Sequence, residues 1–292
     1  MTVAAFAPAK VNLYLHITGR RADGYHLLDS LVAFADIGDR ITARRAASLS
    51  LEVEGPEAPQ LAGLGEDNLV LRAARLLADH TGIAEGASLN LEKNLPVAAG
   101  IGGGSSDAAA ALRALCELWR VSIEEEELCR LGARLGADVP VCLHGSAAWV
   151  RGVGERVLAA PPLPPAGIML ANPRIMLPTA AVFAARRGRF SDPAGVMPML
   201  RDAAGLAQAL HLCRNDLTEA AIGRVPEIAA VLAALARLPG ALIARMSGSG
   251  ATCFALFADY GAAARARAAL AAAEPGWWTE AGSFVAGTPR SR

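Results

Sequence analysis

Residues 88–120, SLNLEKNLPVAAGIGGGSSDAAAALRALCELWR, place a strand-like run, a glycine-rich loop and a helix-forming run in direct succession. Alanine and leucine favour a helix after the loop, and Ser105 and Ser106 are typical N-cap residues for it. The small residues let backbone amides approach a ligand, and the helix dipole directs positive charge at the same point. The unit therefore predicts a phosphate-binding site.

The glycine-rich loop also has a purely structural interpretation, as a turn that needs small residues. It is not a Walker A loop, because no Lys-Ser or Lys-Thr pair follows the glycines. It also lacks the dinucleotide-binding fingerprint, since Ser105 stands where the third glycine would be. Taken alone, the loop leaves the phosphate site and the structural turn equally open.

The residues before this unit favour strands and one helix. Residues 11–17 alternate apolar and polar side chains, which predicts a half-buried strand whose polar face carries Lys10 and Asn12. The Asp-Gly pair within residues 20–26 predicts a turn, and Asp67 is the expected N-cap of a helix. Two further strand-like runs lie at residues 27–36 and 48–55.

The residues after the unit predict a second helix and two strands. Ser122 and Glu125 have the spacing of a capping box, and the helix that they begin is expected to end near Gly136. The apolar runs at residues 141–145 and 147–150 are expected to be strands.

The run PPLPP at residues 161–165 marks the expected domain boundary, because it can continue neither a helix nor a sheet. The predicted domains are residues 1–163 and 164–292. The second domain is expected to be a smaller α+β unit, since alanine- and leucine-rich helical runs alternate with strand-like runs. Its clearest elements are a strand at 167–172, a strand pair at 242–246 and 253–258, and a helix at 262–273.

The composition excludes several classes of protein. Lys plus Arg and Asp plus Glu both total 28, so no global positive field exists to hold a nucleic acid, and an anionic ligand must be bound locally. The N-terminal stretch, broken by Pro8, lacks the form of a signal peptide, and the sequence has no run that reads as a membrane span, since the long uncharged stretch at residues 157–173 is interrupted by prolines. Five cysteines without a CxxC pair predict buried reduced thiols and a cytoplasmic protein.

Lysine is almost absent from the chain. Lys10 and Lys93 are the only lysines, against 26 arginines. A lysine that persists in such a background is a candidate for chemistry that needs a compact ammonium group. We expect this of Lys10, whereas Lys93→Arg is expected to be close to silent.

Three segments resemble the motifs of the galactokinase, homoserine kinase, mevalonate kinase and phosphomevalonate kinase (GHMP) family. They are APAKVNLYL at 7–15, the glycine loop with its serines at 96–106, and MSGSGATCFALF at 246–257. The resemblance implies an α+β fold with a ribosomal-S5-domain-2-like N-terminal domain and a ferredoxin-like C-terminal domain. It also implies ATP and Mg²⁺, and a third motif whose glycine turn lies beside the phosphate loop.

Longer strings are similar to one branch of this family. They are PAKVNLYLHITGRRADGYH, LPVAAGIGGGSSDAAAAL and LGADVPVCLHG. The resemblance implies phosphorylation of the 2-hydroxyl of a cytidine diphosphate-linked methylerythritol in the non-mevalonate isoprenoid pathway. Val32 departs from the branch, where an aromatic residue is common, and this puts a side pocket for the substrate in doubt.

The resemblance assigns catalysis to Lys10 and Asp138. Without the resemblance, the sequence favours Asp138 as an ordinary polar residue that satisfies a turn. A carboxylate and an ammonium at one hydroxyl would orient it and neutralise the transferred phosphoryl group. The ATP-binding residues implied are Pro96, Val97, Ala98, Ala99, Gly100, Ile101, Gly102, Gly103, Gly104, Ser105 and Ser106. Asn68 is either an adenine contact or a helix-start residue, and Asp107 is given no role.

The substrate residues implied are Tyr25, His26, Phe183, Asn12 and Thr179. Tyr25 and Phe183 are expected to stack on the two faces of the cytosine while His26 hydrogen-bonds its edge. Asn12 would hold the polyol or a phosphate, and Thr179 would lie close. The ligands of the magnesium ion are not indicated.

Two alternatives stay open. Another kinase of the family, for homoserine or mevalonate, is disfavoured by the DGYH turn at residues 23–26. A noncatalytic S5-like module, perhaps for RNA, is disfavoured by the neutral net charge and by Lys10 together with Asp138. We expect a small-molecule substrate, no nucleic-acid or membrane partner, and a monomer or weak homodimer.

Overall fold

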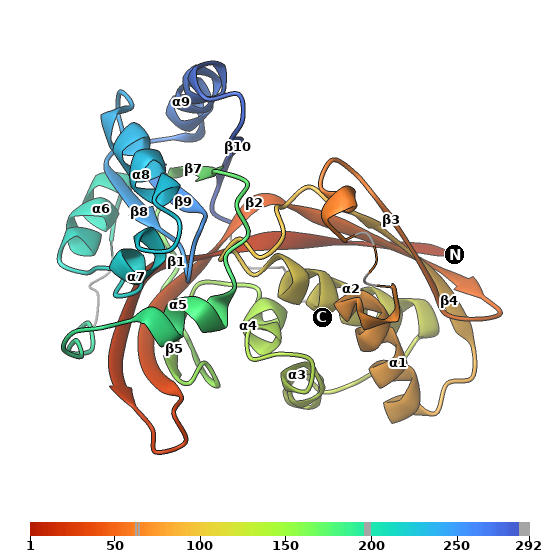
Figure 1. Cartoon of the computed structure of the whole chain (residues 1–292). Coiled ribbons are helices and arrows are strands. Elements are labelled where there is room, and N and C mark those ends of the chain that lie inside the picture. The colour runs from red at the N-terminus through yellow and green to blue at the C-terminus, as the bar shows by residue number, and fades with distance from the viewer. Residues whose placement is uncertain (62, 64, 196–199, 286–292) are drawn as a thin grey trace. The chain divides into compact units, whose positions relative to one another are not determined.

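A computed structural model describes residues 1–61, 63, 65–195 and 200–285 of the chain (Figure 1). It contains helices and strands in both halves, which confirms the α+β class. The described chain forms two compact units, each built from several segments. The first unit comprises Met1–Ala9, Gly38–Val97 and Gly102–His144; the second comprises Lys10–Ile37, Ala98–Ile101 and the chain from Gly145 onward. The predicted boundary at residues 163 and 164 stays a prediction.

Two long strands contribute to both units. They are β1 (Thr2–Arg20) and β2 (His26–Ala46), which pair with each other. The tight turn predicted from the Asp-Gly pair joins them, and its Arg21 and Asp23 side chains form an ion pair of 2.7 Å. Strand β2 extends ten residues beyond the predicted run, and residues 37–44 of this extension alternate buried side chains with more exposed ones.

In the first unit, β2 pairs antiparallel with β4, and β4 pairs in parallel with β3. Helix α2 packs on α1, and Ala108 to Ala111 of α2 are all buried. The elements are β3 (Ser50–Glu54), the 3₁₀ turns η1 (Ala58–Leu61) and η2 (Gly65–Asp67), α1 (Leu69–Thr81), β4 (Gly86–Glu92), α2 (Gly103–Trp119), α3 (Glu125–Ala133) and α4 (Val139–His144).

In the second unit, β2 pairs antiparallel with β5 (Ala148–Gly152), which pairs with β6 (Arg156–Ala159). A separate antiparallel sheet has the strand order β10-β7-β9-β8, and apolar side chains of α8 and α9 pack in the same core as β7 and β9. Its elements are β7 (Gly167–Asn172), α5 (Thr179–Ala185), α6 (Ala203–His211), α7 (Thr218–Ile222), α8 (Glu227–Arg237), β8 (Ile243–Met246), β9 (Cys253–Phe257), α9 (Tyr260–Ala273) and β10 (Trp278–Ser283).

Three predicted helix starts are wrong by a few residues. Asn68, rather than Asp67, caps α1, because its side-chain oxygen accepts the Val70 N–H at 2.9 Å. Helix α2 starts after Gly102 with no side-chain cap, so the two serines lie inside its first turn. Helix α3 starts at Glu125, with Glu124 rather than Ser122 at the N-cap position.

Two other predictions are corrected. Residues 139–144 form helix α4 instead of a strand; the Cys142 N–H donates to the Asp138 carbonyl at 3.0 Å, and Pro140 is tolerated in a first helical turn. The strand at residues 11–17 exists but is buried on both faces, since its polar side chains find partners inside the protein. No helix among the described residues has the length and apolarity needed to cross a membrane.

Candidate nucleotide and substrate site

The glycine loop packs against the glycine turn of residues 247–252, as the third motif predicted. The Thr252 N–H donates to the Ala99 carbonyl at 3.0 Å, and the Ser247 hydroxyl donates to the Gly100 carbonyl at 3.1 Å. Gly100 has φ +74°, and a Cβ there would lie 2.5 Å from the Gly250 carbonyl oxygen. Only glycine fits this close backbone approach.

Helix α2 begins with amides that no side chain caps. Its N-cap residue, Gly102, has φ +63° and carries no side chain, and the Ser106 hydroxyl donates elsewhere, to the Pro8 carbonyl at 2.7 Å. The first N–H groups of a helix have no intrahelical acceptor and carry the positive end of the dipole. The start of α2 is therefore suited to an anionic ligand such as a phosphate.

Strand β1 brings Lys10 and Asn12 to the loop and the turn. The Lys10 N–H donates to the Ile101 carbonyl at 2.9 Å, and the Asn12 N–H donates to the Ser247 hydroxyl oxygen at 3.1 Å. Both side chains are almost fully buried. The backbone of one strand thus links the first and third motifs within the second unit.

Hydrogen bonding fixes the orientation of the Asn12 amide. The Ser30 hydroxyl lies 2.5 Å from the Tyr14 carbonyl oxygen, which can only accept, so the hydroxyl donates there. Ser30 Oγ then accepts from Asn12 Nδ2 at 2.8 Å. Asn12 Oδ1 is left buried without a hydrogen-bond partner among the described residues. This oxygen suits a hydroxyl donor on a ligand, not a phosphate oxygen.

The predicted base-recognition residues lie at the start of β2 and on α5. The His26 and Phe183 rings pack with centroids 5.4 Å apart at 39°. Burial, then the charges of Arg20 and Arg186, lower the pKa of His26, which favours a neutral imidazole. Tyr25 is 65% exposed, and among the described rings Phe183 contacts His26, not Tyr25.

The three other predicted site residues, Thr179, Asp138 and Asn68, lie in different surroundings. The Thr179 hydroxyl, at the start of α5, lies 2.9 Å from the Ser249 hydroxyl of the glycine turn. Asp138 is half-buried in the turn before α4 and belongs to the first unit, whereas Lys10 belongs to the second. Asn68 is a helix cap, which favours the structural alternative weighed for it.

A buried ion cluster around Lys93 escaped prediction. The Lys93 ammonium contacts the Asp39 carboxylate and lies 2.9 Å from Asp107 Oδ2, with all three side chains at most 3% exposed. Its three members are far apart in sequence, so no local pattern reveals them. The one available signal was the persistence of Lys93 in a chain of arginines.

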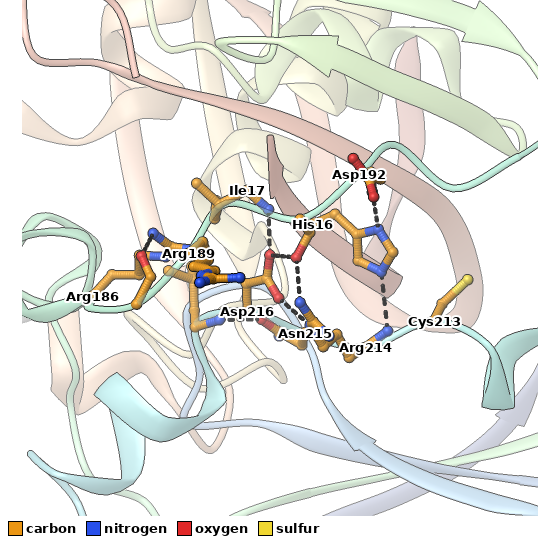
Figure 2. Close-up of polar contacts among 12 residues, drawn as sticks. His16, Ile17, Arg186, Arg189, Asp192, Cys213, Arg214, Asn215 and Asp216 are labelled. Atoms are coloured by element: carbon orange, nitrogen blue, oxygen red, sulfur yellow. Dashed lines mark hydrogen bonds and ion pairs between the residues drawn. The ribbon is translucent and has the colours of Figure 1, made fainter. Parts of the chain in front are cut away.

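A second polar network holds the segment before α7 against β1 (Figure 2). The Asp216 carboxylate accepts from the Ile17 N–H at 2.7 Å, the Ser191 hydroxyl at 2.5 Å and Arg214 Nε at 2.7 Å. Burial alone would raise the pKa of Asp216, but these donors hold it below its ordinary value. The network gives Ser191, Arg214 and Asp216 a part in fixing the strand that carries Lys10.

Comparison with known proteins agrees with this arrangement of motifs. Models of the GHMP kinases N-terminal domain and C-terminal domain match residues 68–146 and 196–276. The 4-diphosphocytidyl-2-C-methyl-D-erythritol kinase of Paramagnetospirillum magneticum is 56% identical over 274 residues, which cover 93% of this chain and 95% of that relative. The chain belongs to the GHMP kinase family. It is therefore an ATP-dependent kinase that acts on a small molecule.

Other members resemble this GHMP kinase along their whole length. The Rhodospirillum rubrum protein of the same name as the first relative is 50% identical over 289 residues, covering 99% of this chain and 95% of its own. A crystal structure of 4-(cytidine 5'-diphospho)-2C-methyl-D-erythritol kinase is 37% identical, with a TM-score of 0.80, and covers 97% of this chain and 100% of its own. A homoserine kinase from Cytophaga hutchinsonii shares the fold at 18% identity and a TM-score of 0.73, covering 98% and 95%.

Proposed function

We propose that this GHMP kinase transfers the γ-phosphoryl group of ATP to the 2-hydroxyl of 4-diphosphocytidyl-2-C-methyl-D-erythritol, a step of the non-mevalonate isoprenoid pathway. The observation that carries the proposal is the identity of 50 to 56% with kinases named for this substrate, over at least 93% of the chain. The homoserine kinase relative shares only the fold.

The triphosphate is bound by backbone N–H groups of the loop that runs from Pro96 to Ser106, with Pro96 itself contributing no donor. The uncapped start of α2 and the left-handed residues Ala98, Gly100 and Gly102 support this, because such backbone turns N–H groups toward an anion. Magnesium would be bound mainly by the nucleotide phosphates and water, as this ion prefers. The described residues contain no group of three metal-ligating side chains, which suits a metal that enters with ATP. Asn68 at the start of α1 is the proposed neighbour of the adenine.

Catalysis is proposed for Asp138 and Lys10. Asp138 orients the acceptor hydroxyl and takes its proton as the new O–P bond forms and the bond from the γ-phosphorus to the bridging oxygen breaks, releasing ADP. Lys10 stabilises the negative charge on the transferred phosphoryl group. Phosphoryl transfer needs little beyond such positioning and charge stabilisation.

The acceptor is proposed to bind through β1, the start of β2 and α5. Asn12 Oδ1, which lacks a donor, accepts from a hydroxyl of the methylerythritol, and Thr179 lies beside the same glycine turn. A neutral His26 hydrogen-bonds the edge of the cytosine. Phe183 and the exposed ring of Tyr25 supply apolar surface for the base.

A coupled ATP-consumption assay with the cytidine diphosphate-linked acceptor, homoserine and mevalonate tests the proposal. We expect turnover with the first acceptor alone. Turnover confined to homoserine or mevalonate would overturn the substrate assignment while leaving the kinase activity in place. The cytoplasmic location and the monomeric or weakly dimeric state stay predictions.

A further inference from the structure

The buried cluster of Lys93, Asp39 and Asp107, here called the lysine cluster, lies in the first unit, where the glycine loop begins and ends. One ammonium contacts two carboxylates there, and water has almost no access to any of them. Buried charges are costly unless they are paired, so such a cluster requires a structural or functional reason.

At the start of the loop, Asp39 binds backbone as well as Lys93. Asp39 Oδ1 accepts the Asn94 N–H at 2.6 Å and the Leu95 N–H at 2.8 Å. These are the two residues before Pro96. The carboxylate therefore fixes the path by which the chain leaves Lys93 and enters the loop.

At the end of the loop, the same lysine lies next to α2. A Cβ on Gly103, the first residue of the helix, would be 3.2 Å from Lys93 Nζ. Asp107, one turn further along α2, binds that ammonium from the helix side. One set of charges thus holds both ends of the segment whose amides face the triphosphate in the proposed function.

The charge of the cluster depends on one proton. With both carboxylates ionised, the cluster would carry a net charge of one negative unit. Burial raises the pKa of Asp107 to about 8, with Lys93 opposing the shift and Asp39 adding to it. The charged groups that face Asp107 are Lys93, directly after β4, and Asp39, on β2. Asp107 Oδ1 has no hydrogen-bond partner among the described residues, which further disfavours ionisation.

We propose that Lys93, Asp39 and Asp107 are positioning residues for ATP binding, which fix the two ends of the glycine loop and keep its underside electrically neutral. A loop held in its binding geometry loses less conformational entropy when the nucleotide binds. A neutral underside also avoids repulsion of the phosphates. The inference rests on the proposed function only in that the loop must bind ATP.

Titration of the magnesium–ATP complex into purified variants tests the inference. Lys93→Met removes the ammonium at similar length and should weaken ATP binding by about tenfold or more, with the KM of the acceptor little changed. Leu131→Ala is the matched control, because Leu131 is about as buried as Lys93 but lies in α3 of the same unit, outside the loop and the lysine cluster. It should lower Tm and leave ATP affinity intact. A folded Lys93→Met variant with the ATP affinity of the parent overturns the inference.

The pH dependence provides a second test that does not need Lys93→Met to fold. As pH rises through about 8, Asp107 of the parent loses its proton and ATP affinity should fall. The last phosphate proton is already lost near pH of about 6, so the ligand contributes little there. Asp107→Asn stays neutral and should show a flat profile. Equal profiles in parent and variant contradict the inference, whereas a parent that binds no ATP contradicts the proposed function instead.

Discussion

The two lysines have different surroundings although both are buried. Lys10 is carried by β1 beside the glycine loop, whereas Lys93 lies between two carboxylates. The expectation that Lys93→Arg is silent is therefore withdrawn. A guanidinium is larger than an ammonium and does not fit into the site bounded by Asp39, Asp107 and the backbone at Gly103.

We predict that Lys93→Arg lowers the free energy of unfolding by about 1–3 kcal/mol, the usual cost of overpacking a buried site. Urea unfolding of parent and variant measures it. Arg44→Lys, an exposed change on β2, serves as the control and should shift the free energy by less than about 0.5 kcal/mol. A variant as stable as the parent would show that the cluster tolerates the larger group.

Lys10→Arg and Asp138→Asn should each lower kcat by about 10²- to 10⁴-fold while ATP affinity changes little. Lys10→Arg keeps the charge but spreads it over a planar group, and Asp138→Asn fills the same space without accepting a proton. Steady-state kinetics and ATP titration on the same preparations separate the two quantities. Parent-like kcat in both variants would leave the family motifs as a binding site only.

The Asp216 carboxylate should make the stability of the folded protein depend on pH in the acidic range. Its pKa is lowered in the folded protein, so its contribution is present above the ordinary pKa of 3.8 and is lost as pH falls through the folded value. Asp216→Asn should therefore destabilise the protein at neutral pH and flatten the dependence of Tm on pH below about 5. Parallel Tm curves for parent and variant across that range would contradict this.

Among the elements, the glycine loop and the glycine turn approach each other so closely that Gly100 has no room for a side chain. We predict that Gly100→Ala abolishes measurable ATP binding, because the new Cβ would meet the Gly250 carbonyl at 2.5 Å and must displace one backbone from the other. Gly82→Ala is the control: Gly82 has φ +71° against +74° for Gly100, but nothing lies within 4 Å of its Cβ position. It carries the strain of the left-handed conformation, about 1–2 kcal/mol, without the clash. Equal ATP affinity in both variants would rule out the contact as the cause.

Secondary structure could be predicted from the sequence where a single local pattern of residues determined it. Strand β4, the loop and helix α2 were predictable in order, because alternation, small residues and alanine content each favour one structure. Residues 141–145 were mistaken for a strand because a short apolar run has no period of its own. The cap of α2 was misplaced because the Ser106 hydroxyl donates to Pro8, a residue 98 positions away that no local pattern includes.

For the molecule as a whole, the sequence was a better guide to which segments lie in contact than to the hydrogen bonds and ion pairs of the side chains in those contacts. The resemblance placed the third motif beside the loop, and the bonds of Ser247 and Thr252 confirm this. It could not show that the Asn12 amide is oriented by Ser30, or that Lys93 joins Asp39 to Asp107. Those pairings depend on strand and helix packing over tens of residues.

Because both lysines are buried, chemical modification of their amines would report local opening of the structure around them. Lys10 is 6% exposed and Lys93 is 2% exposed, so transient opening of the surrounding structure should raise the rate at which an acylating reagent modifies either amine. Mass spectrometry of the two modified peptides would then measure the rate of opening around β1 and around the loop separately. We expect ATP to slow acylation at both positions, and equal rates with and without saturating nucleotide would contradict this.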